Sequence, residues 1–519
     1  MGPIRRRPGD PEPPFRNANL DNALRIAQFR QKHAGADKLD ASQAFKTAPD
    51  RITHAPAFCE GYNAKNPLKS DAFSRISIAL PCSIDNFGDV MSTLKLAKGL
   101  KREFPDKEIV MHIGEDRDLR TLETLCPGLD ISKFDVDGSR RSGEFQGIRI
   151  INGTWGFSNL DVEKDVVCVR LFFEQTRDQN YRHLPRDGQG KPFITRFLLP
   201  ASLNLYVQEY DSAHMVTLPE GMEPNRAYRD RTGRLHMVVR TGFYSGSAGI
   251  HIDPDLAEKK PDGPLDARRP NFFDPVDPHD PEQRWQRLRE ASKMRALKIL
   301  ERDGFEPGDY ARMRWAVAYH NPPKEVSWQP FQEYMFAFEH GYKEDAPAVV
   351  FNFSRMKRED FERMVEDFPW LNHVFLGEGD IQTHRPSSPS NITAVYCGPV
   401  PHEDFLRFMG ESELPAFVTG DMSLSEAISM DKLYIYQTPD WKQGIVYYAI
   451  DLAKSFLNPY DAAVVEELFR LNRQPGTMSA LFYDKHVRDA LKEFNMLVRE
   501  VKDLPHNLAG IIRDGLALI

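Results

Sequence analysis

Strand-like and helix-like runs alternate along most of this 519-residue chain, and that alternation constrains the fold more than any other feature. It predicts parallel β-sheets covered by helices on both faces. We therefore expect an α/β protein with two doubly wound, Rossmann-like domains in tandem. The expected strands are 76–80, 109–113, 148–151, 166–173, 203–208, 235–240, 313–319, 348–353, 373–376, 394–397, 416–419 and 433–437, and the main helices are 90–102, 119–125, 358–368, 403–409 and 423–430.

Two polar, proline-rich stretches interrupt this pattern. Residues 1–75 have few apolar runs and are expected to form a partly disordered extension. Pro and Asp accumulate again from 254 to 281, where they block helices and ladder hydrogen bonds, and a charged helix is expected at 282–302. The predicted organisation is an N-terminal extension at 1–75, a Rossmann-like domain at 76–253, an insertion with a linker helix at 254–310, a second Rossmann-like domain at 311–457, and C-terminal helices that bridge the two domains at 458–519.

Composition argues against several classes of protein. The chain is 41% hydrophobic and 28% charged, which permits a large core. No stretch approaches the ~18 apolar residues that span a bilayer, and no apolar signal core follows Met1. We therefore expect a cytoplasmic protein without a membrane partner. A net charge of -8 argues against nucleic acid as a partner, and five scattered cysteines suggest neither a disulfide framework nor a zinc site.

A turn with two carboxylates follows the first expected strand. Residues 82–89 read Cys-Ser-Ile-Asp-Asn-Phe-Gly-Asp, between a strand-like run and a helix-like run. Ligands of open α/β sheets bind at the carboxyl ends of strands, and Gly88 permits backbone angles closed to other residues. Asp85 and Asp89 are therefore candidates to polarise a nucleophile. The alternative is that Asp85 and Asn86 only form the turn, while Asp89 favours the helix N-terminus electrostatically.

A second candidate turn lies at 418–428, where a strand-like run enters Thr419-Gly420-Asp421 and a helix is expected to begin at Ser423. Amides at a helix N-terminus favour phosphate, and a nearby acid accepts hydrogen bonds from ribose or base. This combination suits a nucleoside diphosphate. The alternative is a capping box, in which Ser423 caps the helix and Glu426 binds back to its amide.

A third candidate is the small-residue loop at 241–250, which includes Ser247 and Gly249 and follows a strand-like run. It lacks the Walker lysine and the dinucleotide-binding glycine pattern, so neither a P-loop nor an NAD site is predicted there. The histidines are separated singles without an HExxH motif, so no metal is expected. No G-x-S-x-G motif occurs, which removes the main support for serine-hydrolase chemistry.

The order of these segments resembles the EarP-type protein-arginine rhamnosyltransferases, inverting GT-B enzymes that modify translation elongation factor P. The resemblance covers most of residues 76–457. Asp85-Asn86-Phe87-Gly88-Asp89 is similar to the family's D-N-Y/F-G-D motif, with one residue fewer after Cys82. Further similar segments are Leu125-Cys126-Pro127, 203–219, the loop 242–250, Ala318-Tyr319-His320-Asn321 and Pro401-His402-Glu403-Asp404-Phe405.

One departure from this family affects the expected donor site. Where the family reads R-G-E-D-S, this chain reads Thr419-Gly420-Asp421-Met422-Ser423, with a shorter acid and no arginine. An arginine would clamp a diphosphate with two parallel hydrogen bonds. The loss of this arginine should weaken diphosphate binding or transfer that role to another residue, and it indicates a divergent relative with a different donor.

The resemblance implies an inverting, metal-independent glycosyltransferase that moves a deoxyhexose or hexose to a protein side chain. The implied donor is a nucleotide diphosphate sugar, TDP-rhamnose in the family, and the implied acceptor is a protein arginine, on elongation factor P in the family. No cofactor is expected, because the nucleotide sugar is a co-substrate. The implied fold is GT-B, in which the two Rossmann-like domains face each other across a cleft, the first holding the acceptor and the second the donor. Asp89 would be the base and Asp85 its catalytic partner, with substrate contacts from Asn86, Phe87, Gly88, Ser247, Gly249, Tyr319, His402, Gly420, Asp421, Ser423 and Gln437.

Two other functions fit the same residues. The chain could be a catalytically lapsed GT-B-like protein that binds a nucleotide or a protein partner, which the missing arginine favours and the two aspartates oppose. It could also be a nucleotide-sugar enzyme of another type, such as an epimerase or a phosphorylase.

Overall fold

The computed structural model describes most of the two expected α/β domains and the C-terminal helices. The residues that it describes are 73–79, 87–113, 116–126, 128–137, 140–152, 167–171, 201–208, 210, 227–229, 234–244, 246–253, 256, 314–320, 328–354, 356–376, 381–387, 390–398, 400, 402–438, 443–470 and 475–517. The expected helix at 282–302 and nearly all of the expected N-terminal extension lie outside these ranges. The division into domains at the predicted boundaries therefore stays a prediction.

The N-terminal sheet has nine described strands in the order β3-β4-β5-β2-β1-β6-β7-β9-β8. The six strands from β5 to β9 run parallel, and antiparallel strands flank them on both edges. The chain passes from β1 to β2 on one side and later returns to β6 on the other, so the topological switch point lies between β1 and β6. The elements are β1 (Arg75–Ala79), α4 (Phe87–Glu103), β2 (Glu108–Ile113), α5 (Asp116–Leu125), a 3-10 turn (Ile131–Lys133), β3 (Asp135–Asp137), β4 (Arg140–Phe145), β5 (Ile148–Asn152), β6 (Val167–Leu171), β7 (Leu203–Val207), β8 (Ala227–Arg229) and β9 (Leu235–Val239).

The C-terminal sheet has seven described strands in the order β13-β12-β14-β11-β10-β15-β16. All neighbours are parallel except β12 and β13, which form a hairpin at one edge. Its switch point lies between β10 and β15. The elements are β10 (Arg314–Ala318), α10 (Gln329–Gly341), β11 (Ala348–Asn352), α11 (Arg358–Asp367), β12 (Asn372–Leu376), β13 (Ile381–His384), β14 (Ile392–Tyr396), α12 (His402–Glu411), β15 (Ala416–Thr419), α13 (Asp421–Ser429) and β16 (Tyr434–Gln437).

The central strands are buried along their whole length, which explains their apolar sequences. Every residue of β1, β7, β9 and β11 is buried, because helices or other segments cover both faces of a parallel sheet. The strand orders confirm the predicted fold class, two Rossmann-like domains of GT-B type.

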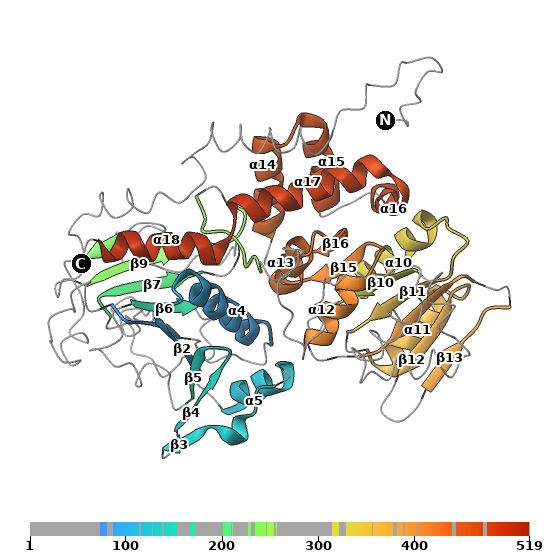
Figure 1. Cartoon of the computed structure of the whole chain (residues 1–519). Coiled ribbons are helices and arrows are strands. Elements are labelled where there is room, and N and C mark those ends of the chain that lie inside the picture. The colour runs from blue at the N-terminus through green and yellow to red at the C-terminus, as the bar shows by residue number, and fades with distance from the viewer. Residues whose placement is uncertain are drawn as a thin grey trace, which may run out of the picture.

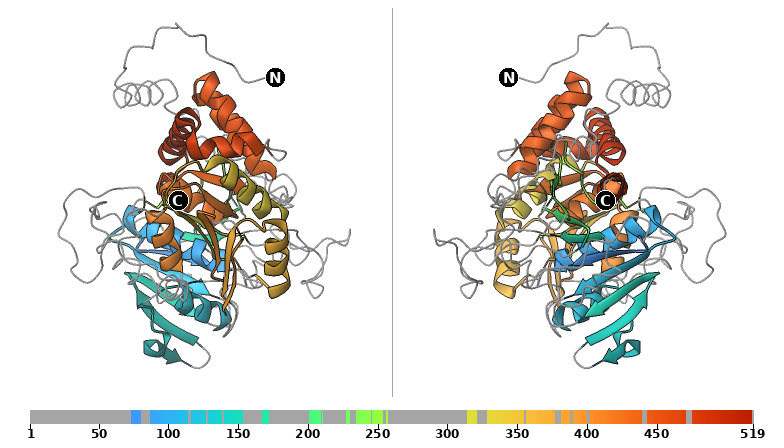
Figure 2. Two further views of the ribbon diagram at one scale, coloured as in Figure 1. Left: turned by 90° about the vertical axis from the view of Figure 1, so that its right-hand side faces the viewer. Right: turned by 90° about the vertical axis from the view of Figure 1, so that its left-hand side faces the viewer.

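Five helices follow the second sheet and contact both domains (Figure 1). They are α14 (Gln443–Phe456), α15 (Pro459–Phe469), α16 (Pro475–Tyr483), α17 (Lys485–Val501) and α18 (Leu504–Leu516). Helix α16 packs on α10 and α17 on α13, whereas α18 packs on α4 and β7 of the other domain. Figure 2 shows α14–α17 gathered on one side of the two sheets. The last helix therefore belongs structurally to the first domain.

Helix α18 approaches α4 closely because α4 has a glycine at the contact. A Cβ atom at Gly99 would lie 2.5 Å from the Cβ of Pro505, so any larger residue would push the helices apart. The ion pair between Arg513 and Glu103 (2.8 Å) joins the same two helices at their solvent side. None of the helices in the described ranges is both long enough and apolar enough to cross a membrane.

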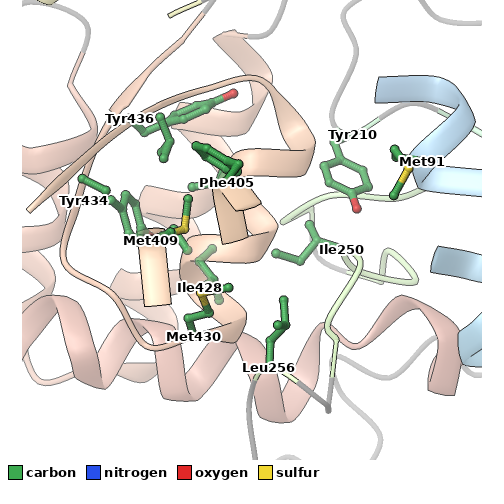
Figure 3. Packing of buried hydrophobic residues seen from close by; sticks show 14 of the residues in the cluster. Met91, Tyr210, Ile250, Leu256, Phe405, Met409, Ile428, Met430, Tyr434 and Tyr436 are labelled. Atoms are coloured by element: carbon green, nitrogen blue, oxygen red, sulfur yellow. The ribbon is translucent and has the colours of Figure 1, made fainter. Parts of the chain in front are cut away.

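One apolar core runs through both domains. Where they meet, Met91 of α4, Tyr210 after β7, and Ile250 after β9 share this core with Ile428 and Met430 at the end of α13 (Figure 3). We call this region the domain junction: α4, Tyr210, residues 246–253 and Leu256 on one side, and α12 and α13 on the other.

Candidate functional site

Both predicted strand-to-helix turns lie at the switch points of their sheets. The first turn connects β1 to α4, and the second connects β15 to α13. Ligands of doubly wound folds bind at this position, outside the carboxyl ends of the strands. Asp85 and Asn86 lie outside the described residues. Phe87, Gly88 and Asp89 form the first turn of α4, which begins three residues before the expected start at Val90.

Helix α13 begins with Asp421, two residues earlier than predicted. Gly420 is its N-cap, with φ 86° and no side-chain cap. Among the residues that the structure describes, none has an atom within 4 Å of a Cβ built at Gly420, so these residues leave space beside the backbone there. The first amides of an α-helix have no carbonyl partner within the helix, and the helix dipole makes this end positive. The start of α13 can therefore accept an anionic group close to the backbone.

The alternative interpretation of this turn, a capping box formed by Ser423 and Glu426, is wrong. Ser423 lies inside α13, and its hydroxyl donates to the Thr419 carbonyl at 2.6 Å instead of capping the helix. The Glu426 side chain contacts Lys95 and His402 instead of the backbone at Ser423. Glycine at the N-cap leaves the turn without the side-chain oxygen that a capping box would place there.

Three strand ends of the C-terminal sheet are joined by one side-chain amide. The Oε1 atom of Gln437, at the end of β16, accepts from the Thr419 hydroxyl at 2.9 Å and lies 2.5 Å from His320 Nδ1. The His320 amide in turn donates to the Ser354 hydroxyl at 2.7 Å. The sequence predicted Gln437 as a site residue. It did not predict that His320, which directly follows Tyr319, would lie within hydrogen-bond distance of Gln437.

Tyr319 lies between β10 and His320, at the same edge of the sheet as Gly420. Its amide donates to the Phe417 carbonyl at 2.8 Å, and its half-buried ring packs at 5.8 Å from the ring of Phe405 on α12. The residues predicted to contact a nucleotide follow or end strands β10, β14, β15 and β16 of one sheet; they are Tyr319, His402, Gly420, Asp421, Ser423 and Gln437.

A buried carboxylate connects the two domains. Lys95 Nζ of α4 binds Oε1 of Glu426 on α13, and His402 Nε2 of α12 lies 2.6 Å from the same oxygen. The Glu426 side chain is only 2% exposed, with Lys95 at 10% and His402 at 16%. Burial alone would raise the pKa of Glu426, but Lys95 and His402 outweigh it and lower that pKa to about 2. Sequence analysis gave no signal for this contact, because 331 residues separate its two charges.

Tyr210 makes a second polar contact across the domain junction. Its hydroxyl accepts from the His251 amide at 2.6 Å and is hydrogen-bonded to the side chain of Ser425 on α13. Burial raises the pKa of Tyr210 well above 10, and the nearby carboxylates of Asp421 and Glu426 raise it further. The phenol therefore stays neutral beside the start of α13.

His251 is also neutral at the domain junction. Burial, together with the Lys95 charge, lowers the pKa of its imidazole to about 3. Its ring lies 5.9 Å from that of Tyr210, at an angle of 43°. The junction thus contains the buried Glu426 carboxylate, compensated by Lys95, and the uncharged rings of Tyr210 and His251.

The loop after β9 packs within the protein. Ser247 is fully buried and donates to the Gly242 carbonyl at 2.6 Å, and Gly249, at φ 98°, lies against the backbone of Lys502. These contacts explain the small residues of the loop by packing. The predicted substrate contacts of Ser247 and Gly249 stay predictions.

No protein-family model and no curated protein sequence matches the chain. The solved structures similar to it include glycosyltransferases and a putative UDP-N-acetylglucosamine 2-epimerase from Listeria monocytogenes. They include a trehalose 6-phosphate synthase from Burkholderia multivorans (TM-score 0.41, 11% identity, 86% of this chain and 98% of that one). EarP, described as mediating arginine glycosylation of translation elongation factor EF-P, is similar over 85% of this chain and 99% of its own (TM-score 0.39, 12% identity). An O-GlcNAc transferase mutant from Thermobaculum terrenum covers 97% of this chain and 76% of its own (TM-score 0.35, 11% identity).

These scores and identities are too low to show a shared family or activity. The Rossmann-like assignment therefore rests on the strand order and register of this chain. The EarP relationship stays a prediction, because it is based on the motifs in the sequence.

A groove of about 610 Å³ lies away from the domain junction, on the N-terminal domain. Its lining includes Glu108 at the start of β2 and Arg149 near the start of β5, at the opposite end of the strands from the predicted site. Positive and negative side chains alternate around it, so it favours no single ligand charge. Within the described ranges, no group of three or more His, Cys, Asp or Glu side chains is arranged to hold a metal ion.

Proposed function

We propose that this protein is an inverting, metal-independent glycosyltransferase whose reaction takes place at the domain junction. It would move a deoxyhexose or hexose from a nucleotide diphosphate sugar to a protein side chain. This proposal rests on the contact between α4 and α13, the helices that begin at the two predicted turns. They are joined by the ion pair of Lys95 and Glu426.

The C-terminal side would hold the donor. The amides at the start of α13 and the open space beside Gly420 favour a phosphate group, as at other helix N-termini. Asp421 would accept hydrogen bonds from the ribose or the base, and Tyr319 would stack on the base. Gln437 and His402 would line the same part of the site, together with the backbone at Ser423.

The N-terminal side would activate the acceptor. Inverting transfer needs a base for the attacking group and stabilisation of the departing diphosphate, because positive charge develops at the anomeric carbon. Asp89 would be this base and Asp85 would orient the acceptor or support the cation. If the acceptor is an arginine, two carboxylates have a further purpose. Guanidinium has a pKa above ~12 and must be polarised before it attacks.

The donor sugar and the acceptor are the finer parts of this proposal. TDP-rhamnose, an arginine acceptor and elongation factor P all come from the resemblance of the sequence motifs to the EarP family. The changed residue at position 419 weakens the case for that donor. Thr419 donates its hydroxyl to Gln437, a neutral contact that supplies no positive charge to a diphosphate.

The same contact favours a second candidate, a catalytically lapsed protein that keeps the two domains and binds a nucleotide or a protein partner. A chain without the arginine clamp would bind nucleotide diphosphates weakly unless another group supplied the charge. This candidate predicts nucleotide or partner binding without transfer.

The first experiment is thermal unfolding with a panel of TDP, UDP, GDP, CMP and NAD. A ligand at about 100 times its dissociation constant stabilises the folded state by ~2.7 kcal/mol. Selective stabilisation by TDP or UDP that is lost in Asp421→Ala would support the donor site. The selected sugar nucleotide is then incubated with candidate acceptor proteins, and a mass increase of one sugar supports transfer. Nucleotide binding without any modified acceptor would favour the lapsed protein, and silence across the panel would contradict the donor site.

A further inference from the structure

The Glu426 carboxylate holds groups from two other helices on one oxygen. Lys95 reaches it from α4 of the first domain, and His402 reaches it from the first residue of α12 in the second. None of the three side chains is more than 16% exposed. Lys95 carries a fixed positive charge into this enclosed space, and Glu426 neutralises it.

A buried pair of this kind resists separation. Moving α4 away from α13 would leave a carboxylate and an ammonium in an interior that cannot solvate them. The relative position of the two helices is therefore set by short, directional contacts as well as by apolar packing. The Asp253 amide, which donates to the Ser429 hydroxyl at 3.1 Å, supports the far end of the same helix.

Because each helix is rigid, the position of the ion pair also fixes the position of the helix's first turn. Lys95 lies six residues after Asp89, and Glu426 lies six residues after Gly420. At 1.5 Å per residue, Asp89 in the first turn of α4 and Gly420 at the start of α13 are each within ~9 Å of the ion pair along rigid helices. A change in the angle between α4 and α13 would thus alter the distance between the two turns.

We propose that Glu426 is a positioning residue, which fixes α4 against α13 and so sets the distance between the first turn of α4, which includes Asp89, and the predicted nucleotide contacts at the start of α13. The expected effect of Glu426 on sugar transfer rests on the proposed function. Its expected effect on the packing of α4 against α13 does not. Lys95 is the sharper residue to test, because it lies on α4 and outside the predicted nucleotide contacts.

The test compares Lys95→Met, Lys95→Arg and Glu426→Gln in the full chain by hydrogen exchange. Lys95→Met and Glu426→Gln are expected to speed amide exchange in α4 and α13, with α11 unchanged, and the double variant to do no more than either single one. Lys95→Arg retains the charge and should restore protection. Glu362→Gln, which removes an exposed pair with Arg358 inside α11, is the matched control and should leave the junction unchanged. Equal acceleration throughout the molecule would overturn the proposal, because it would indicate general destabilisation.

The second arm measures nucleotide affinity and transfer in the same variants. Small displacements at a reacting centre cost about 100-fold in rate, so Lys95→Met should lower kcat by about this factor and leave the dissociation constant of the nucleotide unchanged. An affinity that falls as far as kcat would place Lys95 in the binding site and overturn the positioning role. An unchanged kcat would also overturn it. If the wild-type protein neither binds nucleotide nor transfers sugar, the proposed function fails, and the exchange experiment alone decides whether Glu426 orders the junction.

Discussion

Gly249 lies so close to Lys502 that a Cβ atom at position 249 would come within 2.1 Å of the Lys502 carbonyl oxygen. The Ile250 amide donates to that same oxygen at 2.8 Å, and the Leu504 amide donates back to the Ile250 carbonyl at 2.8 Å. The loop after β9 and the link between α17 and α18 are therefore paired through their backbones. Only a residue without a side chain fits this approach.

Gly249→Ala is expected to destabilise the protein by at least about 2 kcal/mol. The substitution adds a clash with backbone to the cost of a positive φ for an L-residue, which alone is about 1–2 kcal/mol. Urea unfolding measures the loss. Gly246→Ala is the matched control, since Gly246 also has a positive φ (73°) but no atom within 4 Å of its would-be Cβ. Equal losses in the two variants would show that the contact with Lys502 contributes nothing.

The stabilising effect of Glu426 is expected to disappear in acid. Its pKa falls from the ordinary 4.5 to about 2, because Lys95 and His402 outweigh burial. A lowered pKa means that the contribution is complete above about pH 4.5 and is lost as the pH falls through 2. At neutral pH it corresponds to about 3 kcal/mol.

The difference in unfolding free energy between wild type and Glu426→Gln should therefore be constant near pH 7 and shrink between pH 4.5 and 2. Urea unfolding at several pH values measures it. Glu466→Gln, at a solvent-exposed pair with Lys454 and Arg470, is the control and should change stability by no more than about 1 kcal/mol. A wild-type advantage that persists unchanged at pH 2 would be inconsistent with a buried ionised Glu426.

Asp503→Asn is expected to stabilise the protein at pH 7. Burial raises the pKa of Asp503 from 3.8 to about 6, and its side chain accepts from the His506 amide at the start of α18. With a raised pKa, folding is favoured most below pH 3.8, and this advantage is lost as the pH rises through 6. Asn caps helices as well as Asp does but carries no charge to desolvate.

The gain should be about 2 kcal/mol at pH 7, after a discount for the partial exposure of this carboxylate, and should vanish below about pH 4. Thermal and urea unfolding at both pH values provide the measurement. Asp503→Ala removes the cap as well and should gain about 1 kcal/mol less than Asp503→Asn. A loss of stability in Asp503→Asn at pH 7 would show that the carboxylate is stabilising where it stands.

Asp89→Asn is expected to abolish sugar transfer and leave nucleotide binding intact. The amide cannot accept the proton that a catalytic base must take, whereas the predicted nucleotide contacts all lie on the other domain. Intact-mass analysis of the acceptor measures transfer, and thermal shift with the selected nucleotide measures binding. Asp135→Asn, at an exposed position of β3, is the matched control. Continued transfer by Asp89→Asn would exclude Asp89 as the base.

The alternating apolar runs predicted most of the two sheets correctly. Strands β1, β2, β11 and β15 lie within one residue of their expected bounds, because buried parallel strands have continuous apolar sequences. The hairpin of β3 and β4 was not predicted. Strand β3 has only three residues, all of them exposed, so it contains no apolar run from which a strand could be predicted. Helix α10 was also missed, although Phe331, Tyr334 and Phe338 recur at helical spacing.

The candidate site was only partly predictable. Sequence placed Tyr319, Asp421 and Gln437 near strand ends, and topology brings these ends to one edge. The sequence did not predict the ion pair between Lys95 and Glu426, because that contact depends on how the two domains pack together. The start of α13 was misplaced for a local reason: Ser423 and Glu426 have the capping-box spacing, but Gly420 at a positive φ starts the helix earlier.

Helix α18 has a consequence for the order in which this protein can be assembled. It follows both sheets in the chain, yet it covers α4 and β7 of the first one. During synthesis, the first domain would leave the ribosome with that apolar surface bare, and would remain so while the whole second domain is translated. The first domain to be made is therefore the last to be completed, and until then it depends on avoiding contact with other exposed chains.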